Sequence, residues 1–198
     1  MTRSAKRLLD RIAALVLLVI SSPVLIAACI AIRLESSGSP IYRQRRIGKD
    51  GVPFDLYKLR TMVSGAEGMG TGLAVDEGDP RITRVGGFLR RFSLDELPNL
   101  INVLRGEMSL VGPRPTVRAQ VEQYSERQRK RLTVEPGITG WAQIKGRAAL
   151  PWHDRIELDL WYVEHWSLRL DLRILVATVG LLLSGKGLYR GTTGGWRP

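Results

Sequence analysis

The sequence predicts a small mixed α/β domain of α+β-like organisation, attached to an N-terminal apolar segment that enters a membrane. The 198 residues suffice for one sizeable core, and no shift in composition divides them into comparable halves. Short strand-like and helix-like patterns follow the apolar segment without an internal repeat. We therefore expect a membrane segment at 1–35, a globular domain at 36–190 and a flexible tail at 191–198.

The chain is strongly basic. Lysine and arginine total 30 against 19 aspartates and glutamates, a formal net charge of +11. Such a balance favours a polyanionic partner: nucleic acid, anionic lipid or a phosphate-rich substrate. The single cysteine, Cys29, cannot form an internal disulfide, so a reducing, cytoplasmic setting is expected.

Residues 12–32 are uncharged and mostly apolar, and this run is long enough to span a bilayer. It exceeds the ~7 to 15 apolar residues of a signal peptide. Ser22 and Pro23 interrupt it near the middle, where proline removes a backbone donor and bends a helix. Basic residues flank both ends and favour the cytoplasmic side. The residues alone leave two alternatives open: a re-entrant hairpin or a kinked transmembrane helix.

The first elements of the domain have clear patterns. Residues 40–59 alternate in polarity around a Lys-Asp-Gly turn at 49–51, which predicts a β-hairpin. Residues 64–79 are rich in glycine and acidic side chains, which is typical of a mobile loop and of a substrate lid. Apolar residues then recur at helical spacing from position 94 to Gly106, which predicts a helix with Ser93 as its N-cap.

Two further helices are expected. Residues 116–132 carry many charges, which predicts a helix with one solvent-exposed face. The apolar run 174–183 is too short to span a bilayer. Because basic residues flank it, it can form an amphipathic helix at the membrane interface; a buried core helix is the equally weighted alternative.

The segment around Asp95 and Glu96 is the most informative for chemistry. In the first turn of a helix capped by Ser93, unpaired N–H groups and the helix dipole favour negative charge, so Asp95 would stay ionised as a nucleophile must. The same helix end could receive a phosphate. The competing interpretation is structural, because Ser93 and Glu96 also form a capping box. Arginines at 84–91 favour a site for a diphosphate.

Two more segments could bind phosphate. Prolines on either side of Arg114 stiffen the backbone and present the guanidinium for bidentate binding, although a structural turn with an exposed arginine is the simpler interpretation. Residues 136–144 form a glycine-rich loop whose backbone could approach a ligand, a weak signal by itself. For magnesium, the carboxylates of Asp95, Glu96 or Asp159 would suffice beside substrate phosphates. His153 and His165 stand apart and are expected at the surface.

Together and in this order, these segments give a specific signal for one protein family. From about Lys6 to Leu183 the chain resembles the bacterial sugar transferase family, the monotopic phosphoglycosyl transferases, in the order of Ser22-Pro23, YKLRTM (57–62), DPRIT (79–83), FSLDELPNL (92–100), SLVGPRP (109–115), PGITGWAQI (136–144) and ELD (157–159).

The resemblance implies a topology. It implies a re-entrant membrane helix that breaks at Ser22 and Pro23, and a domain at 36–190 that faces the cytoplasm of a bacterium from the inner membrane, with interfacial helices. It implies no nucleic-acid partner.

The resemblance also implies a reaction. Asp95 attacks the sugar-bearing phosphate of a UDP-sugar, releases UMP and carries a covalent phosphosugar, which a polyprenol phosphate, undecaprenyl phosphate in bacteria, then takes over. Glu96 helps to hold magnesium, and the basic residues expected near the phosphates or the uridine are Lys58, Arg90, Arg114 and Arg147. Lys145 departs from the asparagine expected in many relatives, which leaves the sugar open.

Two rival functions remain at this point. A non-catalytic, membrane-anchored basic protein that binds anionic lipid or nucleic acid would explain the net charge and the apolar segment. It gives no reason for two adjacent carboxylates near arginines. A related transferase that uses another nucleotide diphosphate donor is the second rival.

Overall fold

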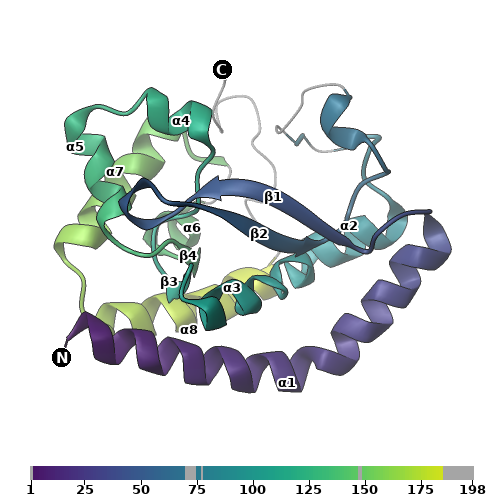
Figure 1. Cartoon of the computed structure of the whole chain (residues 1–198), viewed down its shortest axis with the longest axis horizontal. Coiled ribbons are helices and arrows are strands. Elements are labelled where there is room, and N and C mark those ends of the chain that lie inside the picture. Colours follow the sequence, from purple (N-terminus) through teal and green to yellow (C-terminus); the bar gives the residue numbers. More distant parts are fainter. Residues whose placement is uncertain (1, 70–74, 77, 147–148, 185–198) are drawn as a thin grey trace.

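The structure, a computed structural model, describes residues 2–69, 75–76, 78–146 and 149–184; the expected tail at 191–198 lies outside them. It confirms a mixed helix and sheet fold, with the hairpin β1–β2 above the long helices α1 and α8 and with α4, α5 and α7 at one end (Figure 1). The elements are α1 (Arg3–Glu35), β1 (Ile41–Ile47), η1 (Lys49–Gly51), β2 (Pro53–Leu59), η2 (Ala66–Gly68), α2 (Arg84–Arg91), η3 (Leu94–Glu96), α3 (Asn99–Arg105), β3 (Ser109–Val111), α4 (Arg118–Glu122), α5 (Glu126–Arg129), η4 (Lys130–Thr133), β4 (Gly137–Thr139), α6 (Trp141–Lys145), α7 (Trp152–Glu164) and α8 (Leu168–Ser184).

Helix α1 is continuous through Pro23 and bends, so that its C-terminal part turns upward toward α2 (Figure 1). Pro23 has no N–H to donate to the carbonyl of Val19, but the Ser22 hydroxyl donates to that oxygen at 2.8 Å. The freed carbonyl is therefore satisfied within the helix. The structure replaces the expected break at Ser22 and Pro23 by a bend. Among the described residues, α1 is the one helix long and apolar enough to cross a membrane.

The predicted β-hairpin is confirmed. Strands β1 and β2 pair antiparallel, with Ile41 opposite Leu59 and Ile47 opposite Pro53. The turn η1 lies where Lys-Asp-Gly predicted it, and Asp50 adopts a left-handed conformation with φ of 54°. Alternation along β1 directs Tyr42, Gln44 and Arg46 to one face of the hairpin.

The helix expected from position 94 to Gly106 is divided. Leu94–Glu96 form the 3₁₀ turn η3, and α3 begins only at Asn99. Pro98 lies between them and cannot donate the backbone bond that would continue one helix from η3 into α3. Ser93 has a φ of 53° and its side chain makes no capping bond, so the expected N-cap and capping box are wrong. The helix end at Gly106, with φ of 78°, is as expected.

The helix expected at 116–132 is also wrong as a single element. It consists of α4, α5 and the 3₁₀ turn η4. Tyr124, which lies between α4 and α5 in the sequence, has a buried side chain. Ser125 starts a new helix with a capping box to Gln128. Burial of one aromatic ring thus outweighs the helical propensity of the charged residues around it.

Helix α8 has one side buried in the core and one exposed apolar side. Leu170 and Ile174 are buried in the main core with Phe54 and Leu100. The opposite side of α8 exposes apolar side chains to the surroundings, namely Leu172, Val176, Val179 and Leu183. That side is suited to a membrane interface, which stays a prediction.

Both ends of α1 are fastened to the domain. Near the N-terminus, Lys6 forms ion pairs with Asp171 at 2.7 Å and with Asp10 at 3.3 Å, and Asp10 accepts a hydrogen bond from Ser109 at 2.5 Å. Tyr162 donates to Asp171 at 2.7 Å. We call Lys6, Asp10, Ser109, Tyr162 and Asp171 the anchor cluster.

At the other end of α1, the Glu35 carboxylate accepts hydrogen bonds from the backbone N–H groups of Arg84 (2.8 Å) and Val85 (3.1 Å). These are unpaired donors in the first turn of α2, where the helix dipole also favours a negative charge. The two ends of a helix that could span a membrane therefore contact the same domain.

Candidate active site

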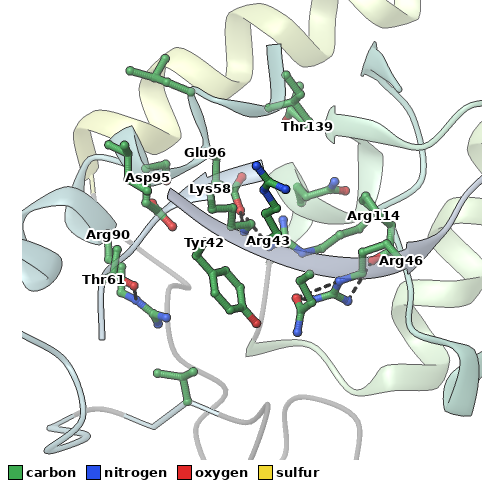
Figure 2. A pocket seen from close by; sticks show the side chains of 18 of the residues that line it. Tyr42, Arg43, Arg46, Lys58, Thr61, Arg90, Asp95, Glu96, Arg114 and Thr139 are labelled. Atoms are coloured by element: carbon green, nitrogen blue, oxygen red, sulfur yellow. Dashed lines mark hydrogen bonds and ion pairs between the residues drawn. The ribbon is translucent and has the colours of Figure 1, made fainter. Parts of the chain in front are cut away.

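A cavity of about 1660 Å³ is lined by residues of the hairpin β1–β2, of η3 and of the helices α1, α7 and α8. It is larger than the ~300 to 1,000 Å³ of an ordinary ligand pocket. Figure 2 shows Asp95, Glu96 and Lys58 together in this cavity, with Arg114 and Arg46 to one side and Arg90 to the other.

The turn η3 places two adjacent carboxylates at the wall of the cavity. Asp95 is 8% exposed and lines it. Glu96 uses one oxygen, Oε1, to accept from Lys58 Nζ at 2.5 Å and from Arg114 Nη2 at 2.9 Å. Its Oε2 makes no hydrogen bond or ion pair with the described residues. Predicted residues from three separate segments, Lys58, Asp95–Glu96 and Arg114, are thus brought together.

The two carboxylates differ in their ionisation. Burial raises the pKa of Asp95 above its usual range; Lys58 opposes this rise, and the neighbouring Glu96 adds to it. Burial also disfavours the charged form of Glu96, but Arg114 and Lys58 outweigh burial and hold its pKa well below its usual range. The helix end expected to keep Asp95 ionised is replaced by the 3₁₀ turn η3, and Lys58 favours the charged form without outweighing burial.

Arg114 owes its position to close backbone packing. A Cβ on Gly140 would lie 2.1 Å from the carbonyl oxygen of Gly112, and a Cβ on Gly137 would lie 2.1 Å from the Gly112 nitrogen. The glycines of 136–144 therefore let this segment touch the segment that carries Arg114. We had expected these glycines to admit a ligand; in the structure they admit the neighbouring backbone.

Arg90 points into the cavity from α2, where its Nε donates to the Thr61 hydroxyl at 2.8 Å (Figure 2). A glycine makes this approach possible as well, since a Cβ on Gly86 would lie 2.0 Å from the Thr61 carbonyl oxygen. Arg147 lies outside the described residues. Lys145 places its ammonium 4.6 Å from the ring centroid of Trp141.

Asp159 lines the same cavity but is already engaged. It is 1% exposed, and its Oδ2 accepts a short hydrogen bond from Arg131, while its Oδ1 has no partner. Among the described residues, no group of three metal-ligating side chains gathers. The role of Asp159 as a magnesium ligand stays a prediction. His153 and His165 are exposed, as expected.

Sequence reasoning missed several residues that line the cavity. Tyr42 lies directly opposite Lys58 in the hairpin, and Arg46 follows on the same face of β1. The period-two pattern of the strand was a signal that could have found them. Arg81 of the DPRIT segment has a structural contact: its guanidinium bonds to Asp79 at 2.7 Å and to the carbonyl of Met69 at 2.8 Å, and so holds the described start of the expected lid.

One part of the cavity is apolar. Its lining there comes from Leu17 and Ile20 of α1 and from Leu175, Leu181 and Leu182 of α8. Hydroxyl groups of Thr139 and Thr178, 2.7 Å apart, join this part to the charged part. Figure 2 places Thr139 beside α8, across the cavity from Tyr42. A charged site and an apolar compartment are thus continuous.

Comparisons with known proteins agree with this geometry. The family model described as bacterial sugar transferase matches residues 1–185. The chain belongs to the bacterial sugar transferase family.

Its relatives include other sugar transferases. The uncharacterized sugar transferase EpsL of Bacillus subtilis is 45% identical over 93% of this chain and 90% of that protein. A UDP-glucose:undecaprenyl-phosphate glucose-1-phosphate transferase of Caulobacter vibrioides is 44% identical over 93% of this chain and 72% of that protein. An Escherichia coli transferase of the same name is 44% identical over 94% of this chain and 42% of that protein.

Proposed function

We propose that this protein transfers a sugar phosphate from a UDP-sugar to undecaprenyl phosphate, with release of UMP, through a covalent intermediate on Asp95. The observation that carries the proposal is the continuity of the cavity. Adjacent carboxylates among basic side chains at one place suit a diphosphate, and the apolar compartment between α1 and α8 suits the chain of a lipid acceptor. The names of the relatives support the same donor and acceptor.

In the first step, a carboxylate oxygen of Asp95 attacks the sugar-bearing phosphorus. A phosphorus–oxygen bond forms on Asp95, the bond to the bridging diphosphate oxygen breaks, and UMP leaves with that oxygen. Lys58 and Arg114 both bind Glu96, the neighbour of Asp95. From there they could also neutralise charge on the transferred phosphoryl group. Covalent catalysis divides one difficult transfer into two easier steps.

In the second step, an oxygen of the lipid phosphate attacks the same phosphorus and Asp95 leaves as a carboxylate. Both steps take place at one phosphorus, and attacking and leaving oxygens lie in line, so the lipid phosphate must approach opposite Asp95, at the position that UMP has left. The apolar compartment could hold the lipid chain meanwhile. Water must be excluded between the steps because it would hydrolyse the intermediate; the loop 64–79 is our candidate cover.

Magnesium fits the carboxylates. Glu96 keeps Oε2 available, and Asp95 lies beside it, so two carboxylate oxygens and substrate phosphates could hold the ion. When bound, magnesium would neutralise charge on the diphosphate. Asp159 is a weaker candidate because Arg131 occupies one of its oxygens.

For the membrane we propose the re-entrant arrangement, at the cytoplasmic face of the bacterial inner membrane. The anchor cluster and Glu35 tie the two ends of α1 to one domain, so a crossing with its ends on opposite sides would have to break one of these sets of contacts. The bend at Pro23 lets the helix enter and return. Basic flanks favour the cytoplasmic side for both ends.

The test is to incubate the protein with a set of UDP-sugars, magnesium and undecaprenyl phosphate and to measure UMP. At least one donor should yield UMP in an acceptor-dependent, steady-state reaction. UMP from no UDP-sugar would contradict the proposal; release of another nucleotide monophosphate from a different donor would support the second rival, and no turnover with any donor would support a binding protein.

A further inference from the structure

The cavity continues past Arg114 to a face of α7 that the proposed chemistry does not use. Trp152, Arg155 and Asp159 lie three and four residues apart, so they share this face, and all three line the cavity. Arg114 connects the two regions, because it interacts electrostatically with Asp95 and Glu96 on one side and with Asp159 on the other.

Arg155 carries a positive charge that no described acceptor neutralises by contact. The nearby guanidinium groups are paired, since Arg114 binds Glu96 and Arg131 binds Asp159. Arg155 makes no hydrogen bond or ion pair with the described residues, and its Nε is buried without a partner. Burial, together with the neighbouring Arg114, lowers its pKa. Asp159 opposes this lowering without a direct contact, and a half-buried cation that lacks a bonded acceptor is costly unless an anion arrives.

Trp152 forms an aromatic wall beside this cation. It is half-buried, and its ring stacks on that of Tyr124 with centroids 5.8 Å apart, which fixes its orientation. Gln120 and Thr116, which bond to one another, line the same part of the cavity with polar groups. An anion site next to a fixed aromatic surface and amide or hydroxyl groups matches the chemistry of a nucleotide.

We propose that Arg155 binds the nucleoside-side phosphate of the donor and that Trp152 packs against its base or ribose. This rests on the proposed function for the identity of the donor. With the sugar-bearing phosphorus at Asp95, the other phosphate extends past Arg114 toward Arg155, and the departing UMP remains paired with that guanidinium. The base and ribose then lie at the α7 end of the cavity, and the lipid chain lies between α1 and α8.

The test compares Arg155→Gln with Arg127→Gln, a matched change at an exposed arginine that pairs with Glu157. Equilibrium dialysis of the full chain in lipid nanodiscs measures UMP and pyrophosphate binding without catalysis. Arg155→Gln should weaken both ligands about tenfold or more, the size of a lost charged hydrogen bond, and Arg127→Gln less than about twofold. Arg155→Lys should bind both ligands with an affinity between those of the wild type and Arg155→Gln. It supplies the result if the Gln variant does not fold.

Two further measurements separate the alternatives. Trp152→Leu should weaken UMP binding while leaving pyrophosphate binding near that of the wild type. In turnover, Arg155→Gln should raise KM for the UDP-sugar more than KM for undecaprenyl phosphate. If only the lipid KM rises, the anion is the lipid phosphate and the proposal is overturned, as it is if UMP binding does not change. If UMP binds through Arg155 but no donor yields UMP, the proposed function fails while the nucleotide site stands.

Discussion

The anchor cluster and the active site are both buried groups of charges, but they are built differently. In the anchor cluster each charge has partners: Lys6 has two carboxylates, and Asp171 also accepts from Tyr162 and Trp166. The cavity beside it is only about 20 Å³, too small for a ligand. In the active site, among the residues that the structure describes, Glu96 keeps one oxygen available and Arg155 makes no contact with an acceptor, beside a cavity of about 1660 Å³.

The difference separates structural charges from functional ones. A buried charge with satisfied hydrogen bonds fixes the arrangement of elements, here the N-terminus of α1 against β3, α7 and α8. Buried charges without complete partners lower stability unless a ligand supplies the missing contacts. Substitutions in the anchor cluster should therefore affect folding, and substitutions in the active site should affect binding and chemistry.

The largest effect is expected at Asp95. Asp95→Asn should abolish UMP release, because an amide cannot attack phosphorus usefully. Ser109→Ala, in the anchor cluster, should retain much of the activity, because the hydroxyl bonds to Asp10 and to the backbone of Val111 and does not line the active-site cavity.

With the lipid acceptor withheld, donor labelled in the sugar should leave label on the wild-type protein and none on the Asn variant. Near-normal turnover of Asp95→Asn would rule out the covalent route through this residue.

The next effect is on stability. Lys6→Met leaves the carboxylates of Asp10 and Asp171 buried without their cation, which should lower the free energy of unfolding by ~3 kcal/mol. Denaturant unfolding in detergent micelles measures this change. The matched control is Arg45→Met, which removes an exposed ion pair with Asp55 and should cost less than ~1 kcal/mol.

The folded fraction of Lys6→Met should still become labelled by the donor, because Lys6 does not line the active-site cavity. Full stability with lost labelling would reverse the assignment of the two clusters.

Residues of the active site could be predicted from sequence, and those of the anchor cluster were not. The motifs predicted Asp95, Glu96, Lys58, Arg90 and Arg114 as site residues, and local patterning predicted the hairpin. The division of the helix after Glu96 depends on Pro98 and on a left-handed residue at 93, which serine rarely adopts.

Other features could not be predicted because they depend on tertiary packing. The unpaired state of Arg155 follows from which carboxylates Arg114 and Arg131 take, and no local pattern encodes that choice. The close packing of Gly112 on Gly140 likewise involves segments that meet only in the folded chain.

A smaller effect is expected in the pH dependence. Asp95 must be ionised to attack, and burial raises its pKa, so the labelling rate should fall on acidification from a higher pH than an ordinary aspartate would give. Lys58 lowers that pKa. Lys58→Met should therefore move the acid limb of the pH–rate profile, where the labelling rate falls, to still higher pH, besides slowing the reaction. Single-turnover labelling without acceptor avoids titration of the lipid phosphate. Arg45→Met should leave the limb unchanged, and an unshifted limb in Lys58→Met would contradict this electrostatic coupling.

The last prediction concerns the bend of α1, which depends on Pro23 and on the Ser22 hydroxyl that satisfies Val19. Replacing both residues with leucine should give a straighter apolar helix of spanning length. Because the anchor cluster still holds the N-terminus of α1 to the domain, we expect only part of the molecules to invert and to lose activity. Adding Lys6→Met should increase the inverted fraction.

Cysteine-accessibility labelling at Ser4, in a background with Cys29 replaced, measures the inversion. In the wild type, label applied from outside the cell should not reach position 4. If it does, α1 is a true membrane span and the contacts of both its ends with one domain cannot form in the membrane.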